Sequence, residues 1–165
     1  MTSAPSEANV QGEVGGADGG EELDEPRQTA AAFVTAVAWG EHLRVWDLFT
    51  AEARSLVLRV AVTRGMDERL AARLRDGTAT NAERDTFLGD LVNGLRADLK
   101  GTDLDSLQFE PDADTGQPDP NRTRIMLMVP VVNPLLGAPL PVASIELVRD
   151  RGQWRVEHLF PRIQR

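Results

Sequence analysis

The sequence predicts an α+β domain in which N-terminal helices pack on one face of an antiparallel sheet of about four strands. Apolar residues recur at helical spacing between residues 26 and 100, whereas residues 104–160 contain short strand-like runs. The chain then returns near its end through a hairpin sequence, Gly152-Gln-Trp-Arg-Val156. Helices that precede a sheet without alternating with its strands are typical of α+β folds.

The acidic charge of the chain is concentrated at its N-terminus. The 165 residues carry a formal net charge of −8, but residues 1–25 hold seven acidic residues and no basic one, so the remainder is nearly neutral. Residues 1–25 also contain five glycines and few large apolar side chains, which predicts a disordered tail. We therefore expect one folded domain over residues 26–165. We expect no nucleic-acid partner, because phosphate binding needs a concentrated basic surface.

Several sequence features are absent, and their absence excludes classes of function. The chain has no cysteine, which excludes disulfides, thiolate metal sites and cysteine nucleophiles. No stretch approaches the roughly 18 consecutive apolar residues of a membrane helix, and no signal peptide is recognisable, so we expect a cytoplasmic protein without membrane contact. Two distant histidines and the lack of a Gly-rich phosphate loop or a nucleophile elbow predict no metal, no other cofactor and no serine hydrolase.

Each predicted helix has a recognisable start or stop signal. Asp24 is expected to cap the first helix, Gly40 to end it and Thr50 to cap the third. Thr80 and Glu83 predict a capping box before the fifth. The five predicted helices span residues 26–39, 43–49, 51–64, 67–75 and 81–100. The third is expected to bury an apolar stripe and the fifth a longer seam. These consist of Leu56, Val57, Val60 and Ala61, and of Phe87, Leu88, Leu91, Leu95 and Leu99.

Four strands are predicted in the last third of the chain, at residues 105–110, 122–130, 142–149 and 153–160. Residues 111–121 are rich in turn formers and are expected to form a loop. Residues 125–129 are apolar at every position, which predicts a central strand covered on both faces. Alternation in the last strand predicts that Trp154, Val156, His158 and Phe160 share one face.

Two segments resemble the nuclear-transport-factor-2-like superfamily. The first runs from Phe33 to Arg54, with a Gly break and then a Trp-x-Leu-x-Thr-x-Glu-x-Arg pattern. The second is the hairpin from Val142 to Val156. The resemblance implies a sheet curved into a cone that can hold a small molecule, and a homodimer formed through the sheet. The helices at 67–100 and the 111–121 loop depart from a minimal member.

The resemblance also implies a site inside the cone. The expected pocket residues are Phe33, Val37, Trp46, Met126, Met128 and Trp154. Each of them also suits an ordinary core position. For a catalytic member, His158 is the candidate general base, with Asp47 or Glu146 as its carboxylate partner. Surface placement explains the two carboxylates more simply, and His158 also suits a strand-end position with its ring partly exposed or bonded to a backbone carbonyl. The chain has no tyrosine, so the tyrosine donors of a ketosteroid-isomerase-like site are excluded.

Three hypotheses for the function follow. We expect a non-catalytic accessory protein of the nuclear-transport-factor-2-like type, which holds a small apolar ligand or a protein partner. The alternative is a small cyclase, isomerase or dehydratase that acts on a hydrophobic metabolite, with His158 as its base. The third hypothesis is a structural domain whose acidic tail contacts a basic partner.

Overall fold

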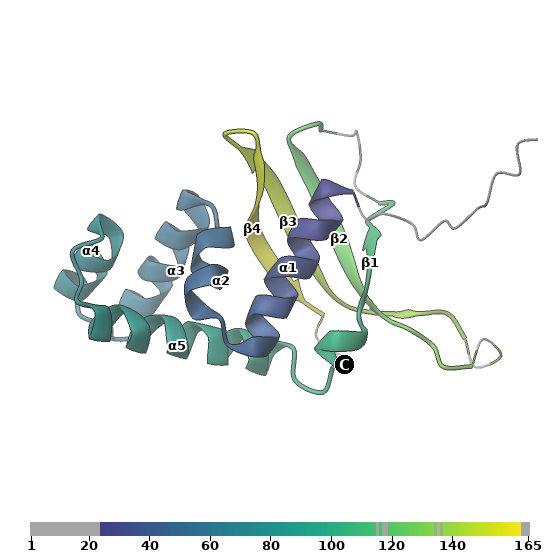
Figure 1. The fold of residues 1–165 in the computed structure, drawn as a ribbon, viewed down its shortest axis with the longest axis horizontal. Helices are drawn as coiled ribbons and strands as arrows, with labels where there is room; N and C mark the ends of the chain where they lie inside the picture. The colour runs from purple at the N-terminus through teal and green to yellow at the C-terminus, as the bar shows by residue number, and fades with distance from the viewer. Residues whose placement is uncertain (1–23, 115, 117–118, 134, 136, 163–165) are drawn as a thin grey trace, which may run out of the picture.

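The computed structural model describes residues 24–114, 116, 119–133, 135 and 137–162 (Figure 1). The predicted tail lies outside the described residues except for Asp24 and Glu25, and so does part of the predicted 111–121 loop. The fold is therefore described from the start of the first helix onward.

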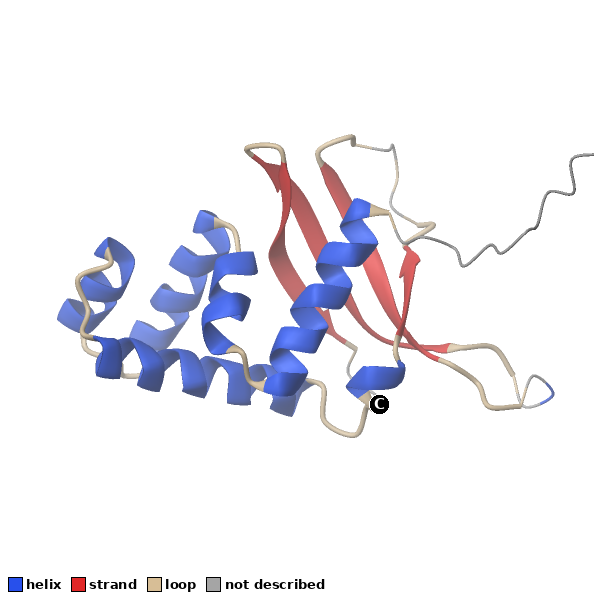
Figure 2. Ribbon diagram, in the orientation of Figure 1, coloured by secondary structure: helices blue, strands red, loops and turns tan. Residues whose placement is uncertain are grey.

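Within the described residues, five helices precede four antiparallel strands, which confirms the predicted α+β class (Figure 2). The helices are α1 (Glu25–Trp39), α2 (His42–Leu48), α3 (Ala51–Thr63), α4 (Glu68–Asp76) and α5 (Asn81–Asp98). A short 3-10 turn, η1 (Leu104–Ser106), leads into β1 (Gln108–Pro111), β2 (Arg122–Val129), β3 (Leu140–Asp150) and β4 (Gln153–Pro161). The strands pair in the order β1-β2-β3-β4. The sheet does not close on itself, because β1 and β4 are not paired.

Helix α1 lies across one face of the sheet, and the core forms between them (Figure 1). Phe33 and Val37 of α1 are fully buried, as are Leu127 of β2 and Ile145 and Leu147 of β3. These residues belong to one apolar cluster. Burial of the apolar area in this cluster is the main contribution that stabilises the domain.

The helix caps form as the sequence predicts. The Asp24 carboxylate accepts a hydrogen bond from the backbone N–H of Arg27 at 3.0 Å. The Thr50 hydroxyl caps α3, and Thr80 and Glu83 form both hydrogen bonds of the capping box at the start of α5. Each cap satisfies backbone amides that have no partner inside their own helix.

The end of α1 is fixed by a side chain from α5. Gly40 adopts the left-handed conformation, with φ of 72°, which favours glycine. The Arg96 side chain donates from Nε to the carbonyl oxygen of Val37 at 2.9 Å and from Nη2 to that of Ala38 at 2.5 Å. A cation at a helix C-terminus also interacts favourably with the helix dipole, so Arg96 connects α1 and α5.

The remaining helices extend beyond the edge of the sheet at β4 (Figures 1 and 2). Helix α2 packs on α1 and α5, while α3 packs on α4 and β4. Among the described residues, α1 is thus the main helix that covers the sheet, and it covers one face. Met126 and Met128 of β2 alternate with the buried Ile125 and Leu127 and lie half-buried on the opposite face. The prediction that β2 is covered on both faces is therefore wrong.

A β-bulge changes which residues of β4 face the core. The register between β3 and β4 shifts between Val156 and His158, which leaves Glu157 as the extra residue. Val156 is fully buried in the core, but His158 and Phe160 face the other side of the sheet, because one added residue inverts the alternation. The prediction that Trp154, Val156, His158 and Phe160 share one face is wrong for this reason.

The bulge also joins the sheet to the helices. The buried Glu157 carboxylate accepts a hydrogen bond from the Thr50 hydroxyl. The Thr50 backbone N–H donates to the carbonyl oxygen of Val156 at 2.9 Å, and Phe49 forms a parallel bridge with Val156. The junction between α2 and α3 is therefore attached to the outer edge of β4.

Candidate functional site

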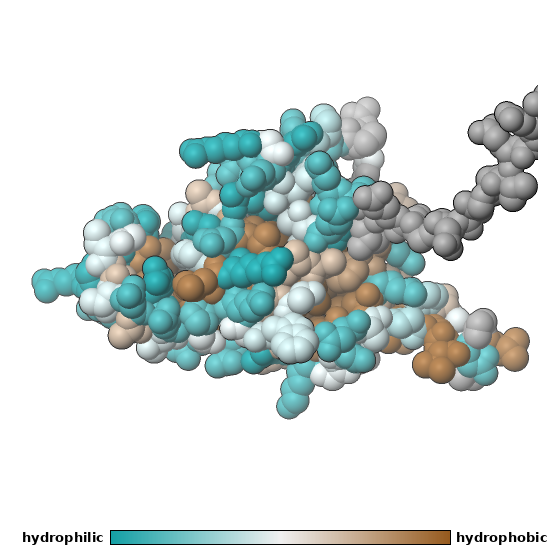
Figure 3. Space-filling view, in the orientation of Figure 1, coloured by the Kyte–Doolittle hydropathy of each residue, from teal (hydrophilic) through white to brown (hydrophobic). Residues whose placement is uncertain are grey.

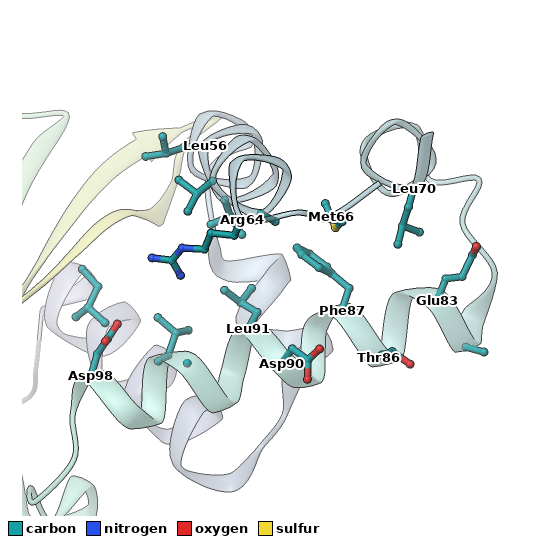
Figure 4. Close-up of a pocket in the computed structure, with 17 residues that line it drawn as sticks. Leu56, Arg64, Met66, Leu70, Glu83, Thr86, Phe87, Asp90, Leu91 and Asp98 are labelled. Atoms are coloured by element: carbon teal, nitrogen blue, oxygen red, sulfur yellow. The ribbon is translucent and has the colours of Figure 1, made fainter. Parts of the chain in front are cut away.

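An apolar cleft of about 1010 Å³ lies beyond the β4 edge of the sheet (Figure 4). Helix α5 forms one wall, and the opposite wall comes from α3, the turn after it and α4. Leu159 of β4 completes the lining. The larger apolar side chains of the lining include Leu56, Val60, Met66, Phe87, Leu91 and Leu95.

One face of α5 lines the cleft along almost its whole length. The lining positions recur in pairs at each turn of the helix, from Ala82 and Glu83 to Asp98, as expected for a single helical face. Leu88 and Val92 point the other way and are buried. The predicted buried seam of α5 is thus split, because Leu88 is enclosed by the protein while Phe87 and its neighbours at the next turns face the cleft.

The prediction that α3 buries an apolar stripe is also wrong. Leu56 and Val60 are 37% and 40% exposed and line the cleft, instead of forming a buried stripe. The residues of α3 that are buried are Ala53 and Leu58. The reason is that α3 packs against α4 and β4 while α5 packs against α1 and α2, so the stripe faces α5 across the cleft and does not pack against it.

Three charged side chains at the cleft have no ion pair among the described residues. Asp90 and Asp98 stand on the α5 wall, and Arg64 projects from the end of α3 toward the cleft (Figure 4). Glu83 differs, because it forms an ion pair with Arg73. The hydrogen bond from Arg73 lowers the pKa of Glu83 below its ordinary value. The walls of the cleft are therefore mainly apolar, Asp90 and Asp98 lie along the α5 wall, and Arg64 projects into the cleft from the other wall.

A separate apolar spot lies at the far end of the molecule. The connection between β2 and β3 carries the exposed Val132 and Leu135, and Figure 3 shows brown atoms at that end, apart from the brown patches in the middle of the same face. Isolated exposed apolar residues are normal on protein surfaces. The cleft differs in that apolar side chains from α3, α5 and β4 line one hollow.

The six expected pocket residues do not line one cavity: four of them belong to the core or pack against it, and the two methionines lie elsewhere. Phe33 and Val37 are fully buried in the core, and Trp154 packs against that core. Met126 and Met128 lie on the opposite face of the sheet. Trp46 packs edge-to-face on Phe87, with ring centroids 5.9 Å apart, so it supports the cleft from behind without lining it.

Two of the three expected catalytic residues do meet. His158 Nδ1 lies 3.4 Å from Glu146 Oε2, on the sheet face away from α1. Glu146 also forms an ion pair with Arg122. Burial opposes ionisation of Glu146, but the hydrogen bond and charge of Arg122 outweigh it, and the pKa of this carboxyl is lowered. Asp47 is remote from this pair and forms an ion pair with Arg54 at 3.7 Å.

The chemistry available to this pair is limited by its surroundings. The His158 side chain is 38% exposed. It borders a hollow of about 490 Å³ whose lining is mixed, with the charged Glu52 and Arg59 beside Ala51 and Leu56. No set of three or more metal-ligating side chains gathers in the described part of the chain. An imidazole on an open surface lacks the water-excluded environment that strengthens acid–base and electrostatic catalysis.

Sequence reasoning missed the cleft, although one signal was available. Several predicted helices carry an apolar face, and α3 and α5 are among them. One face of the sheet together with α1 is not enough to cover all of these apolar faces. Comparing the number of apolar helix faces with the number of surfaces that can cover them indicates that one pair of helix faces remains uncovered. It does not indicate which pair, because this depends on how α2 is placed between α1 and α5.

Comparison with known proteins leaves the family open. The chain matches no model of a known protein family, and no curated protein sequence is significantly similar to it. Among the described residues, no helix combines the length and apolar character needed to cross a bilayer.

Proposed function

We propose that this protein is a non-catalytic binding protein and that the cleft beside α5 is its binding site. The observation that carries the proposal is the exposure of Leu56 and Val60, which face Phe87, Leu91 and Leu95 across an open cleft. A contiguous exposed apolar surface with charged side chains beside it is typical of an interaction site. Filling it would remove this apolar area from water, which is favourable by about 25 cal/mol per Å².

A catalytic function has less support. It relies on the 3.4 Å approach of His158 to Glu146, but that pair lies outside the apolar cleft and is not among the residues that line it. Arg122 already pairs with Glu146 and favours its ionised form, as in a structural ion pair. The cyclase, isomerase or dehydratase alternative would require substrate to be held at this open sheet face.

A pair of glycines on α5 provides the experiment. Gly94 lines the cleft and Gly89 does not, and a Cβ added at either position meets no atom within 4 Å. Binding of a fluorescent apolar dye to the full chain should be weakened in Gly94→Leu, because the new side chain projects into the cleft and occupies part of it, and kept in Gly89→Leu. Equal dye binding by both variants and the wild type would refute the cleft as the binding site.

We also propose, from the resemblance of residues 33–54 and 142–156, that the chain is a nuclear-transport-factor-2-like protein that forms a homodimer through its sheet. The half-buried Met126 and Met128 on the face without helices support this surface as the contact. Sedimentation velocity at high micromolar concentration should then show a dimer. A monomer under these conditions would contradict the proposal.

A further inference from the structure

We infer that the occupant of the cleft is an amphipathic α-helix of a partner protein, with basic residues along the edge that faces α5. The inference rests on the proposed function, since it names the class of partner for the same site. It is carried by two observations, which are the length of the open helix face and the unpaired charges along the α5 wall.

The shape of the cleft fits a helix. The α5 wall extends from Ala82 to Asp98, which corresponds to about 24 Å at 1.5 Å per residue. Phe87, Leu91 and Leu95 recur along the middle of this wall, and Val60 lines the cleft from the other wall. Figure 4 shows Met66 on that other wall, opposite Phe87. A helix of about 16 residues matches this length, and helices bind such grooves through apolar residues at positions i, i+3, i+4 and i+7.

The charges indicate which helix would fit. Asp90 and Asp98 on the α5 wall have no ion pair among the described residues, and they are eight residues apart, which is about 12 Å along the helix. Two basic side chains seven or eight residues apart on a partner helix would face them. Arg64 projects from the opposite wall into the cleft and would repel a basic edge on its own side, so we expect the basic edge of the helix on the α5 side.

The charges also argue against the N-terminal segment of the same chain as the occupant. Residues 1–25 carry seven acidic residues and no basic one, and Asp90 and Asp98 would repel them. Complementary charges across an interface favour one partner and suppress others. A basic helix from another protein is the occupant that satisfies both the apolar walls and the acidic side chains of the α5 wall.

The test uses the full chain and two synthetic peptides of 18 residues. Both carry leucines at helical spacing; one has two lysines eight residues apart on one edge, and the other has glutamates at those two positions. Fluorescence anisotropy should show binding of the lysine peptide and not of the glutamate peptide. Binding should be weakened in Gly94→Leu and kept in Gly89→Leu, which also distinguishes the cleft from the acidic N-terminal residues.

A matched pair of double variants tests whether the acidic side chains of the α5 wall contribute to binding. Asp90→Asn with Asp98→Asn should weaken binding of the lysine peptide roughly three- to tenfold, as expected for two exposed ion pairs. Glu68→Gln with Asp76→Asn removes the same charge at the same eight-residue spacing from α4, outside the cleft lining, and should change the affinity less than twofold.

Each outcome decides between the proposals. Equal affinity for both peptides, equal loss in both double variants, or peptide binding that is unaffected by Gly94→Leu would overturn the inference. Dye binding that depends on Gly94, with no binding of either peptide, would overturn the inference and leave the proposed function in place. If neither dye nor peptide binds, both the inference and the proposed function fail.

Discussion

The two mid-helix glycines of α5 allow the open cleft to be tested through stability alone. Gly89 and Gly94 lie in the interior of α5 (Asn81–Asp98), and a Cβ at either position would meet no atom within 4 Å. Glycine in a helix interior costs about 0.8–1.0 kcal/mol relative to alanine. Gly89→Ala and Gly94→Ala should therefore each raise the free energy of unfolding by about 1 kcal/mol, which corresponds to an increase in Tm of roughly 2–4 °C for a chain of this size.

Urea denaturation of the two variants beside the wild type provides the measurement, with the m-value as a check that the unfolding transition is unchanged. The decisive comparison is between the variants. If Gly89→Ala stabilises the protein while Gly94→Ala is neutral or destabilising, the cleft face of α5 is packed against another surface in solution. That result would refute the open cleft, and the proposed binding site with it.

Three further predictions concern the rest of the fold. Gly40→Ala should lower the stability by about 1–2 kcal/mol in urea denaturation, because φ is 72° and the new Cβ would lie 3.2 Å from Arg96 Nη2; an unchanged midpoint would contradict the described end of α1. Thr50→Val removes both the cap and the hydrogen bond to the buried Glu157 and should cost roughly 2–4 kcal/mol, whereas Thr50→Ser should cost much less; equal losses would contradict the role of the hydroxyl. The pKa of Glu146 is lowered from 4.5, so its stabilising contribution is present above that pH and is lost as the pH falls through the lower value of the folded state. The stability difference between wild type and Glu146→Gln should accordingly be largest near neutral pH and disappear in acid, and a difference independent of pH would exclude this linkage.

The parts of the fold that depend on local chemistry could be predicted from the sequence. Asp24, Thr50 and the Thr80–Glu83 pair are confirmed as caps, because a cap is formed by residues within one turn of each other. The helix end at Gly40 is confirmed for the same reason. The α+β class followed from the order of the periodic segments, which also needs no knowledge of long-range contacts.

The parts that depend on how elements meet could not be predicted in this way. The bulge at Glu157 inverts the face of His158, and its stabilising partner is Thr50, more than 100 positions earlier in the chain. The stripe of Leu56 and Val60 has the spacing of a buried face, yet its exposure depends on where α5 lies. Periodicity identifies an apolar face but does not identify what covers it, which is why the cleft was missed.

The attachment of Thr50 to β4 has a consequence for self-association. An open sheet has two edge strands, and free edges can pair with other chains and initiate fibrils. Here the outer edge of β4 is already bonded at Val156 by the backbone of Thr50, and β1 is only four residues long and ends at Pro111, which has no N–H to donate. Endless edge-to-edge stacking needs two open edges on every molecule, so this arrangement protects the protein against growing into a continuous cross-β polymer.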